Sequence, residues 1–173
     1  SDFSIYSRIP RAVLAHGDLV VTLNELVEGY RDAARSGVEI RFSAALSTLE
    51  ARFDPKLLGR AVRNVLENAL RASDGRGEVE LMLGAAAGSA TIRVADSGPG
   101  VAPEQLQEIF EPYFSTYETG TGLGLAITRR IVEEHGGSIE AVNRAGGGLE
   151  VMITIPLTQD ESIELESHDE PTR

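Results

Sequence analysis

Three glycines at every second position, Gly120, Gly122 and Gly124, mark the segment of this sequence best suited to bind an anion. Because glycine has no side chain, such a segment can bring backbone N–H groups against phosphate. Apolar spacing predicts a helix over residues 123–135, whose N-terminal end would add partial positive charge. The segment is not a P-loop, since no Gly-Lys-Ser/Thr follows, and Leu125 breaks the Gly-x-Gly-x-x-Gly pattern of dinucleotide-binding loops.

Two asparagines in an apolar, helix-periodic stretch form a second candidate group. Asn64 and Asn68 lie four residues apart, so they share one helix face about one turn apart. A side-chain amide oxygen can bind a hard cation such as Mg²⁺ without adding negative charge beside phosphates. Arg71 follows on the same face, and its planar guanidinium can bridge two phosphate oxygens. The alternative is that the asparagines cap or cross-link buried backbone and that Arg71 is an exposed helix-end side chain.

A carboxylate at the end of an alternating apolar run is the third candidate. Asp96 follows residues 90–95, which predict a strand, and precedes a Ser-Gly-Pro-Gly loop. Gly98 and Gly100 would let a flat ligand pack against backbone. A purely local role for Asp96, as a helix cap or turn residue, is the alternative.

Together these segments resemble the N, G1, F and G2 boxes of sensor histidine kinases. The resemblance covers residues 18–157, and the order and spacing of the boxes match the family. Within the family, the sequence most resembles nitrogen-regulation sensor kinases. It implies an α/β two-layer sandwich, in which a mixed, mostly antiparallel sheet is covered on one face by about three helices, and it implies ATP and Mg²⁺ as cofactors. The matching stretches are Asn64-x-x-x-Asn68-Ala69, Asp96-Ser97-Gly98-Pro99-Gly100, Phe110-Glu111-Pro112-Tyr113-Phe114 and Gly120-Thr121-Gly122-Leu123-Gly124-Leu125.

The resemblance also implies a role for each box. Asn68 would be the metal ligand, and Asn64 and Arg71 would act in catalysis. Asp96 would accept a hydrogen bond from the exocyclic amine of adenine, where guanine carries a carbonyl. Phe110 and Phe114 would pack the lid, the segment that precedes the helix over 123–135, over the nucleotide or against the partner hairpin; the alternative is that these aromatic side chains belong to the core. The nucleotide-binding set is Asn64, Asn68, Arg71, Asp96, Gly98, Gly100, Phe114, Gly120, Thr121, Gly122, Leu123 and Gly124.

Two positions depart from the family pattern. Tyr117 stands where relatives often have lysine, and no Lys or Arg occurs between Arg93 and Arg129. The lid would then hold phosphate through backbone N–H groups and Thr121. Leu149 stands where many relatives have threonine.

Three functions share this fold: phosphotransfer to a histidine, ATP hydrolysis that drives a clamp, and nucleotide sensing without chemistry. Hydrolytic relatives have a water-activating glutamate at the position of Asn64, whose amide cannot accept a proton at neutral pH. Glu67 would point about a hundred degrees away on the helix. The pattern therefore favours the catalytic domain of a histidine kinase.

None of the three histidines has the setting of a phosphoacceptor, which in the family lies on a helix beside an acidic residue. His16 is followed by Gly17, His135 ends a predicted helix, where its partial positive charge would suit the helix dipole, and His168 lies in an acidic stretch. We expect the phosphoacceptor on a separate dimerisation hairpin of the full-length kinase, with a response regulator downstream.

Composition gives the outer limits. The 173 residues fit one domain, and the formal net charge of −11 argues against a nucleic-acid or anionic-membrane surface. Without cysteine there is no disulfide or thiolate metal site, and without a long apolar stretch we expect a cytoplasmic domain. Residues 1–17 are interpreted as the end of a dimerisation helix and a linker, the linker beginning at Arg11 and reaching Asp18. Residues 18–157 are interpreted as the catalytic domain and residues 158–173 as a flexible acidic tail.

Periodicity and turn residues predict the remaining elements. Further helices are expected over 19–35, 54–73 and, briefly, 103–109. Strands are expected over 38–42, 49–53, 78–83, 89–95, 138–143 and 150–156, with residues 84–88 as a turn.

Overall fold

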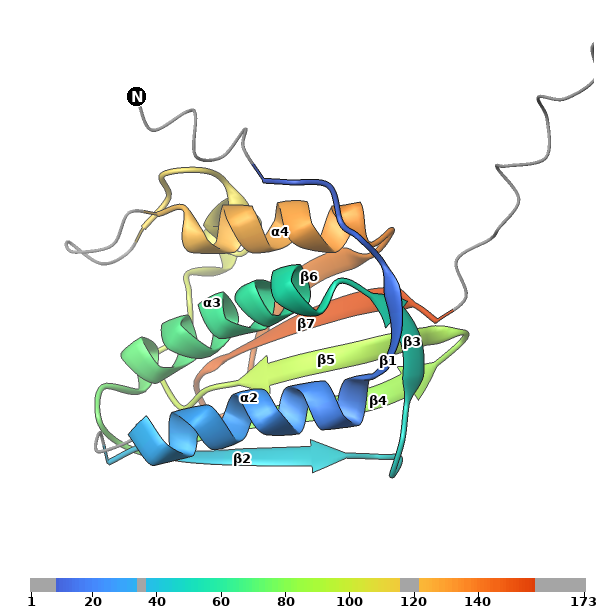
Figure 1. Cartoon of the computed structure of the whole chain (residues 1–173). Coiled ribbons are helices and arrows are strands. Elements are labelled where there is room, and N and C mark those ends of the chain that lie inside the picture. Colours follow the sequence, from blue (N-terminus) through green and yellow to red (C-terminus); the bar gives the residue numbers. More distant parts are fainter. Residues whose placement is uncertain (1–8, 34–36, 116–121, 158–173) are drawn as a thin grey trace, which may run out of the picture.

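The computed structural model, which describes residues 9–33, 37–115 and 122–157, is an α/β sandwich (Figure 1). Its main sheet has five strands in the order β2-β4-β5-β7-β6. β2 and β4 run parallel, and the other neighbours are antiparallel. The strands are β2 (Glu39–Ala44), β4 (Glu78–Ala86), β5 (Ser89–Ala95), β6 (Ser138–Asn143) and β7 (Leu149–Pro156).

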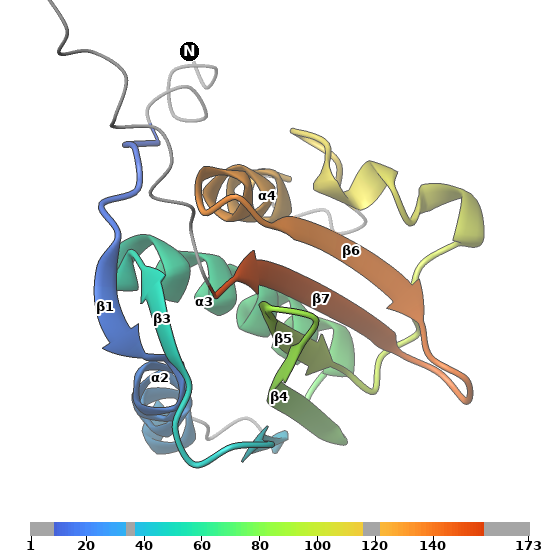
Figure 2. The same cartoon turned by 90° about the vertical axis from the view of Figure 1, so that its right-hand side faces the viewer.

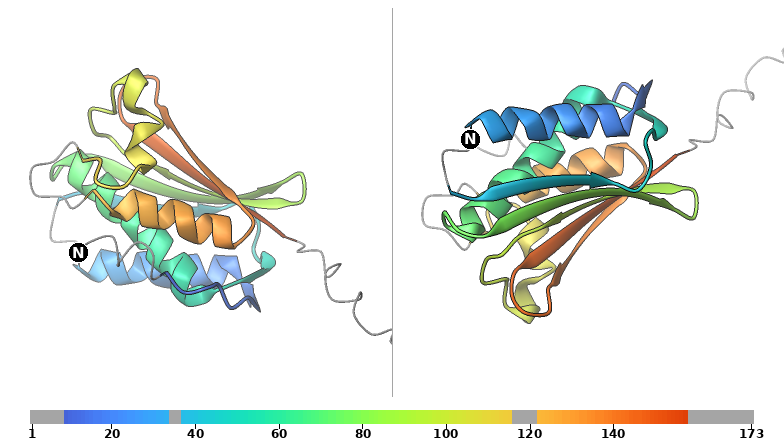
Figure 3. Two further views of the ribbon diagram at one scale, coloured as in Figure 1. Left: turned by 90° about the horizontal axis from the view of Figure 1, so that it is seen from above. Right: turned by 90° about the horizontal axis from the view of Figure 1, so that it is seen from below.

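The α-helices of the described residues, α2 (Leu19–Ala33), α3 (Pro55–Ser73) and α4 (Gly124–Glu134), cover one face of this sheet (Figure 3). This arrangement confirms the expected fold class. None of these helices is both long and apolar enough to cross a membrane.

The core lies between the helices and the sheet because both layers alternate apolar and polar positions with the correct period. In the three central strands every second residue is buried, and in α3 the buried residues recur every three or four positions. Removing these side chains from water is the main stabilising contribution. The central part of the core contains Leu58, Val62, Val65, Leu66, Val79, Leu81, Ile92, Val94, Ile153 and Ile155.

Local signals determine both ends of α3. Asp54 is the N-cap, its Oδ1 accepting a hydrogen bond from Leu57 N at 3.0 Å, and Pro55 is the first helical residue. Asp74 ends the helix in the left-handed conformation, with φ of 49°. The prediction of a helix that begins after Asp54 and runs to Ser73 is therefore confirmed.

The interpretation of Arg11–Asp18 as a linker is wrong for its second half. Ala15–Asp18 forms strand β1, which pairs antiparallel with β3 (Glu50–Phe53) in a separate two-stranded sheet. Figure 2 shows this small sheet beside the beginnings of α2 and α3. The sequence Ala-His-Gly-Asp does not alternate, so only its pairing with residues 32 to 38 positions later makes it a strand, with Ala15 opposite Phe53 and Asp18 opposite Glu50.

Two smaller expectations also differ. β4 extends to Ala86, which leaves only Ala87 and Gly88, both at positive φ, as the turn. In place of the expected helix over 103–109, the structure has two separate 3₁₀ turns, η1 (Pro103–Gln105) and η2 (Glu108–Phe110). Short 3₁₀ turns of this kind are common in connecting segments. Expectations for residues 1–8, 34–35, 116–121 and 158–173 lie outside the described residues.

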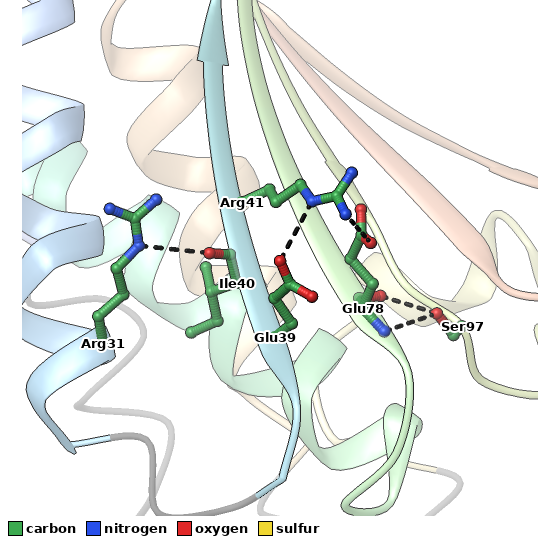
Figure 4. Close-up of polar contacts among 6 residues, drawn as sticks. All are labelled: Arg31, Glu39, Ile40, Arg41, Glu78 and Ser97. Atoms are coloured by element: carbon green, nitrogen blue, oxygen red, sulfur yellow. Dashed lines mark hydrogen bonds and ion pairs between the residues drawn. The ribbon is translucent and has the colours of Figure 1, made fainter.

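Polar contacts fix the first residues of β2 and β4 (Figure 4). Arg31 Nε on α2 donates to the backbone oxygen of Ile40 at 3.3 Å, at the free edge of β2. Arg41 bridges the two strands through ion pairs with Glu39 at 3.3 Å and Glu78 at 3.2 Å. The Arg31 contact occupies part of an edge that could otherwise pair with another chain.

Candidate functional site

A cavity of about 350 Å³ opens between the C-terminal half of α3, the end of β5 and the start of α4. A volume of this size suits a small-molecule ligand. Its walls combine an apolar part with a few polar groups. The apolar residues are Val65, Ala69, Ala72, Val94, Val101, Ile109, Phe114, Leu125, Leu149 and Val151, and the polar ones are Asn64, Glu67, Asn68, Arg71, Asp96 and Ser115.

Asp96 is the buried carboxylate of the cavity. The residue is only 4% exposed, and its Oδ1 accepts hydrogen bonds from Gly98 N at 2.9 Å and Leu149 N at 3.1 Å. No described residue donates to Oδ2, so this oxygen is left for a ligand. Burial raises the pKa of Asp96 above its usual value. The backbone N–H groups of Gly98 and Leu149 and the charge of Arg144 have the opposite effect on this pKa, but burial outweighs them.

The loop that begins at Asp96 is held against its surroundings. Ser97 Oγ accepts from Glu78 N at 3.1 Å and donates to Glu78 O at 2.7 Å, so it is attached to the first residue of β4 (Figure 4). Gly98 lies against Ala72 near the end of α3, where an added Cβ would be 2.7 Å from the Ala72 oxygen. Gly98 therefore supports the wall without lining the cavity, whereas Gly100 lines it.

The two asparagines have different environments. Asn64 Nδ2 donates to the Gly124 backbone oxygen at 3.2 Å, which links α3 to the start of α4 and leaves Oδ1 without a donor among the described residues. The Asn68 amide makes no hydrogen bond to any described residue. The Asn64 side chain therefore does cross-link to backbone, but only through its Nδ2 group. The Asn68 side chain makes no such bond and can contact a ligand with its whole amide.

Charged groups of α3 lie on the same side of the cavity. Arg71 is exposed and lines it. Glu67 lies at its edge, but Glu67 Oε1 accepts a hydrogen bond from the Tyr30 hydroxyl of α2 at 2.9 Å. Burial, with the Glu67 hydrogen bond, raises the pKa of Tyr30. Glu67 is therefore committed to joining the two helices.

A backbone hydrogen bond joins Tyr113 to Gly122, which lie on either side of residues 116–121, a segment that the structure does not describe. Tyr113 N donates to Gly122 O at 2.9 Å, and Tyr113 has an unusual φ of 66°. A Cβ on Gly122 would lie 2.5 Å from Tyr113 C, so only glycine permits this approach. Phe110 is buried in the core, and Phe114 lines the cavity.

The structure thus brings together most of the expected site residues. Asn64, Asn68, Arg71, Asp96, Gly100, Phe114, Gly122 and Gly124 line one cavity. The Leu123 side chain does not, because it packs against Leu57, Ala61, Ile127 and Ile131 between α3 and α4. Gly120, Thr121 and Tyr117 belong to the segment that the structure leaves undescribed.

Sequence reasoning missed several cavity residues. Val65, Ala69 and Val94 occupy apolar positions indistinguishable from core, and Leu149 was noted only as a departure from threonine. Leu149 supplies both a wall side chain and the backbone N–H that holds Asp96. Backbone roles of this kind leave no signal in residue type.

These residues fit ATP and Mg²⁺. Asp96 Oδ2 is an unpaired acceptor suited to an amine, the apolar wall suits a base, and Asn68 offers an amide oxygen. Leu123, the N-cap of α4, makes no side-chain capping bond, and the N-terminal end of this helix carries partial positive charge that favours an anion. Among the described residues no three or more His, Cys, Asp or Glu side chains form a metal cluster, so a metal would depend on amide and phosphate oxygens.

The expectation that His135 carries partial positive charge is wrong. His135 is fully buried, its Nε2 accepts from Asp54 N at 3.0 Å, and its Nδ1 lies 2.8 Å from the Ile131 oxygen. Because Nε2 accepts a hydrogen bond from a backbone N–H, this nitrogen carries no proton, and the ring is neutral. Burial alone would raise the pKa of Asp54, but N–H groups of Val13, Leu57 and Lys56 together lower it.

Comparison with known proteins identifies relatives. The sequence profile of the histidine kinase-, DNA gyrase B- and HSP90-like ATPases matches residues 53–159. Sensor histidine kinase ZraS of Escherichia coli strain K12 is 36% identical over 127 residues, 73% of this chain and 27% of ZraS. Nitrogen regulation protein NtrY of Azorhizobium caulinodans is 33% identical over 165 residues, 90% of this chain and 21% of NtrY. The chain spans less than a third of either relative.

Solved structures agree. The nucleotide-free catalytic domain of histidine kinase ThkA superposes with a TM-score of 0.78 and 27% identity, over 84% of this chain and 96% of that domain. ThkA in complex with the response regulator protein TrrA gives a TM-score of 0.80 at 24% identity, over 91% of this chain and 46% of that one, which shows the fold alone.

Proposed function

The chain belongs to the histidine kinase-, DNA gyrase B- and HSP90-like ATPase family and is an ATP-binding catalytic domain of the sensor histidine kinase type. From this premise we propose that it transfers the γ-phosphoryl group of ATP to a histidine on a separate dimerisation hairpin. One observation carries the proposal. Separate stretches of the chain place Asp96, both asparagines and Arg71 around a single cavity, together with Gly122 and Gly124 at the start of α4.

The base would occupy the apolar end of the cavity. Asp96 Oδ2 would accept a hydrogen bond from the exocyclic amine of adenine, and guanine would present a carbonyl to the same oxygen. Two buried acceptors that face each other are unfavourable, so this contact would select adenine.

The phosphates would lie between α3 and the start of α4. Arg71 would donate to phosphate oxygens, and the first N–H groups of α4 would do the same. Asn68 would hold Mg²⁺ through its amide oxygen, and the bound ion would neutralise phosphate charge. Asn64, fixed by Gly124, would support this arrangement from the preceding turn.

In the transfer step the bond between the γ-phosphorus and the ADP oxygen breaks as a bond to an imidazole nitrogen forms. ADP leaves, and the imidazole proton passes to an acidic residue beside the acceptor histidine. Asn64 cannot activate water as a base, which favours transfer over hydrolysis. We further propose a response regulator as the next acceptor, as the solved ThkA–TrrA complex suggests by analogy.

Calorimetry and label transfer test the proposal. Mg-ATP is expected to bind at least about tenfold more tightly than Mg-GTP, and Asn68→Ala to weaken Mg-ATP by roughly ten- to a hundredfold with little change in melting temperature. Asn24→Ala, at an exposed position of α2, is the control.

Radiolabelled ATP is then supplied with the dimerisation hairpin of the same full-length kinase, and labelled hairpin is expected. Binding without transfer would instead favour a nucleotide-sensing module. Release of phosphate without labelled protein would favour a hydrolysing clamp.

A further inference from the structure

We infer that the hairpin between β6 and β7 positions the loop that reads the nucleotide base, through the side chains of Asn143 and Arg144. This base loop consists of residues 96–101, from the end of β5 to Val101. The inference rests on the proposed function and adds two positioning residues to it, neither of which lines the cavity.

The hairpin holds the start of the base loop at Asp96. Asp96 N donates to Leu149 O at 2.9 Å, and Leu149 N donates to Asp96 Oδ1 at 3.1 Å. Arg144 Nη1 donates to the Asp96 backbone oxygen at 2.7 Å, a short, charge-assisted hydrogen bond. The hairpin thus holds both the backbone N–H and the backbone oxygen of Asp96. These contacts therefore also fix the position of Oδ2, which makes no hydrogen bond to a described residue.

The backbone of the hairpin approaches Asp96 directly. A Cβ on Gly148, which has a φ of 99°, would lie 2.0 Å from the Asp96 backbone oxygen. No side chain fits there, so glycine is required both by conformation and by space. The contact with the base loop, and not the turn alone, explains this glycine.

The hairpin also holds the far end of the base loop, at Val101. Asn143 Oδ1 accepts from Val101 N at 2.9 Å, and Asn143 Nδ2 donates to Val101 O at 2.5 Å. One side-chain amide therefore satisfies both backbone groups of one residue, as a neighbouring strand would. A Cβ on Gly100 would lie 2.6 Å from Asn143 Oδ1, so the loop passes close to this amide.

Two consecutive hairpin residues thus hold the two ends of the base loop. Both Asn143 and Arg144 are exposed and lie outside the core. Exposed side chains contribute little to folding, so their removal should act mainly on the position of the loop. The consequence should appear in the affinity for adenine, which depends on Asp96 Oδ2, more than in melting temperature.

Affinities of the variants for Mg-ATP and Mg-GTP test the inference. Asn143→Ala and Arg144→Ala are each expected to weaken Mg-ATP roughly three- to tenfold, the range for losing such hydrogen bonds. Mg-GTP, which gains nothing from Asp96, should change less, so the ratio of the two affinities should fall. Arg144→Lys keeps a cationic donor and should restore part of the ratio.

Val142→Ala is the matched control, because Val142 precedes Asn143 on β6, is 52% exposed and makes no polar side-chain contact. It should leave the ratio unchanged. Equal losses for both nucleotides, or a ratio that matches the control, would overturn the inference. A wild-type chain that binds no ATP would contradict the proposed function instead, and the two failures are thereby distinguished.

Discussion

At the scale of single residues, Asp96 shows a conflict between stability and binding. Because burial raises the pKa of Asp96, folding favours its neutral form. Its contribution to stability is therefore fully present below the unfolded pKa, about 3.9, and is lost as pH rises through the folded pKa. At neutral pH the ionised carboxylate therefore makes the fold less stable than a neutral side chain of the same shape would. Its contribution is to ligand binding.

Asp96→Asn should therefore be more stable than the wild type at pH 7 and bind ATP less well. We expect a gain of roughly 0.5–2 kcal/mol in the free energy of unfolding, the usual size for such substitutions. ATP affinity should fall at least about tenfold, because the asparagine would present a donor to the adenine amine. Denaturant unfolding from pH 7 to pH 4 should show the stability gain shrinking as the wild-type carboxyl takes up its proton.

Asp18→Asn is the control for this experiment, since Asp18 Oδ1 also accepts two backbone N–H groups, from Val20 and Leu49, but lies outside the cavity. A lower stability of Asp96→Asn at pH 7 would show that the two N–H bonds to Asp96 outweigh its desolvation.

Residue identity predicted the cavity better than it predicted the contacts around it. Asn64, Asn68 and Asp96 could be placed because their spacing within the kinase boxes is specific, and Asp54 because an N-cap is a local signal. Asn143 and Arg144 resemble any polar residues near a hairpin turn. Their role depends on contacts with the base loop, more than 40 positions earlier in the sequence; Val101, for example, lies 42 positions before Asn143. A sequence pattern does not reveal pairs that are so far apart.

At the scale of elements, a buried imidazole joins α3 to α4. His135 follows α4, and its Nε2 accepts from Asp54 N, the N-cap of α3. Sequence position suggested a charged helix end, because burial cannot be read from one residue followed by glycines. The pairing of β1 with β3 was missed for the same reason, since it is made by tertiary contacts.

His135→Ala should remove this link without disturbing the site. The buried Asp54 N–H would lose its acceptor and a cavity would remain, so we expect a loss of about 2–4 kcal/mol in the free energy of unfolding. ATP affinity should change less than about twofold, because His135 lies eleven residues, roughly 16 Å, beyond the start of α4. Denaturant unfolding and calorimetry measure the two effects.

Arg130→Ala is the control on α4, because it removes only an exposed ion pair with Glu134, which should cost less than about 1 kcal/mol. A loss of ATP affinity in His135→Ala comparable to that of Asn68→Ala would contradict a purely structural role for the ring.

At the scale of the whole molecule, the described histidines and the cavity lie at opposite ends of the helix layer. The cavity is bounded by the C-terminal half of α3 and the start of α4. His135 is at the other end of α4, and His16 lies in β1, paired with Arg52 beside the start of α3 (Figure 1). Asn64 is nine residues into α3, roughly 14 Å along its axis from that start.

We therefore expect that the chain binds ATP but does not label itself. His135 is fully buried and hydrogen-bonded on both ring nitrogens, so it cannot reach a γ-phosphate without local unfolding. His16 is exposed, but it lies on a strand with no acidic neighbour on a helix to take its proton. His168 falls outside the described residues, and its acidic surroundings would repel ATP.

Incubation with radiolabelled ATP and Mg²⁺, followed by separation under alkaline conditions that preserve phosphohistidine, measures self-labelling. The isolated chain should remain unlabelled, while the same chain with the supplied hairpin should give an acid-labile label on the hairpin. Three single variants, His16→Gln, His135→Gln and His168→Gln, each checked for folding by its melting temperature, would identify any unexpected acceptor. Label that appears on the wild-type chain alone and disappears in one folded variant would refute the expectation, because that histidine would then reach ATP within a molecule or between copies.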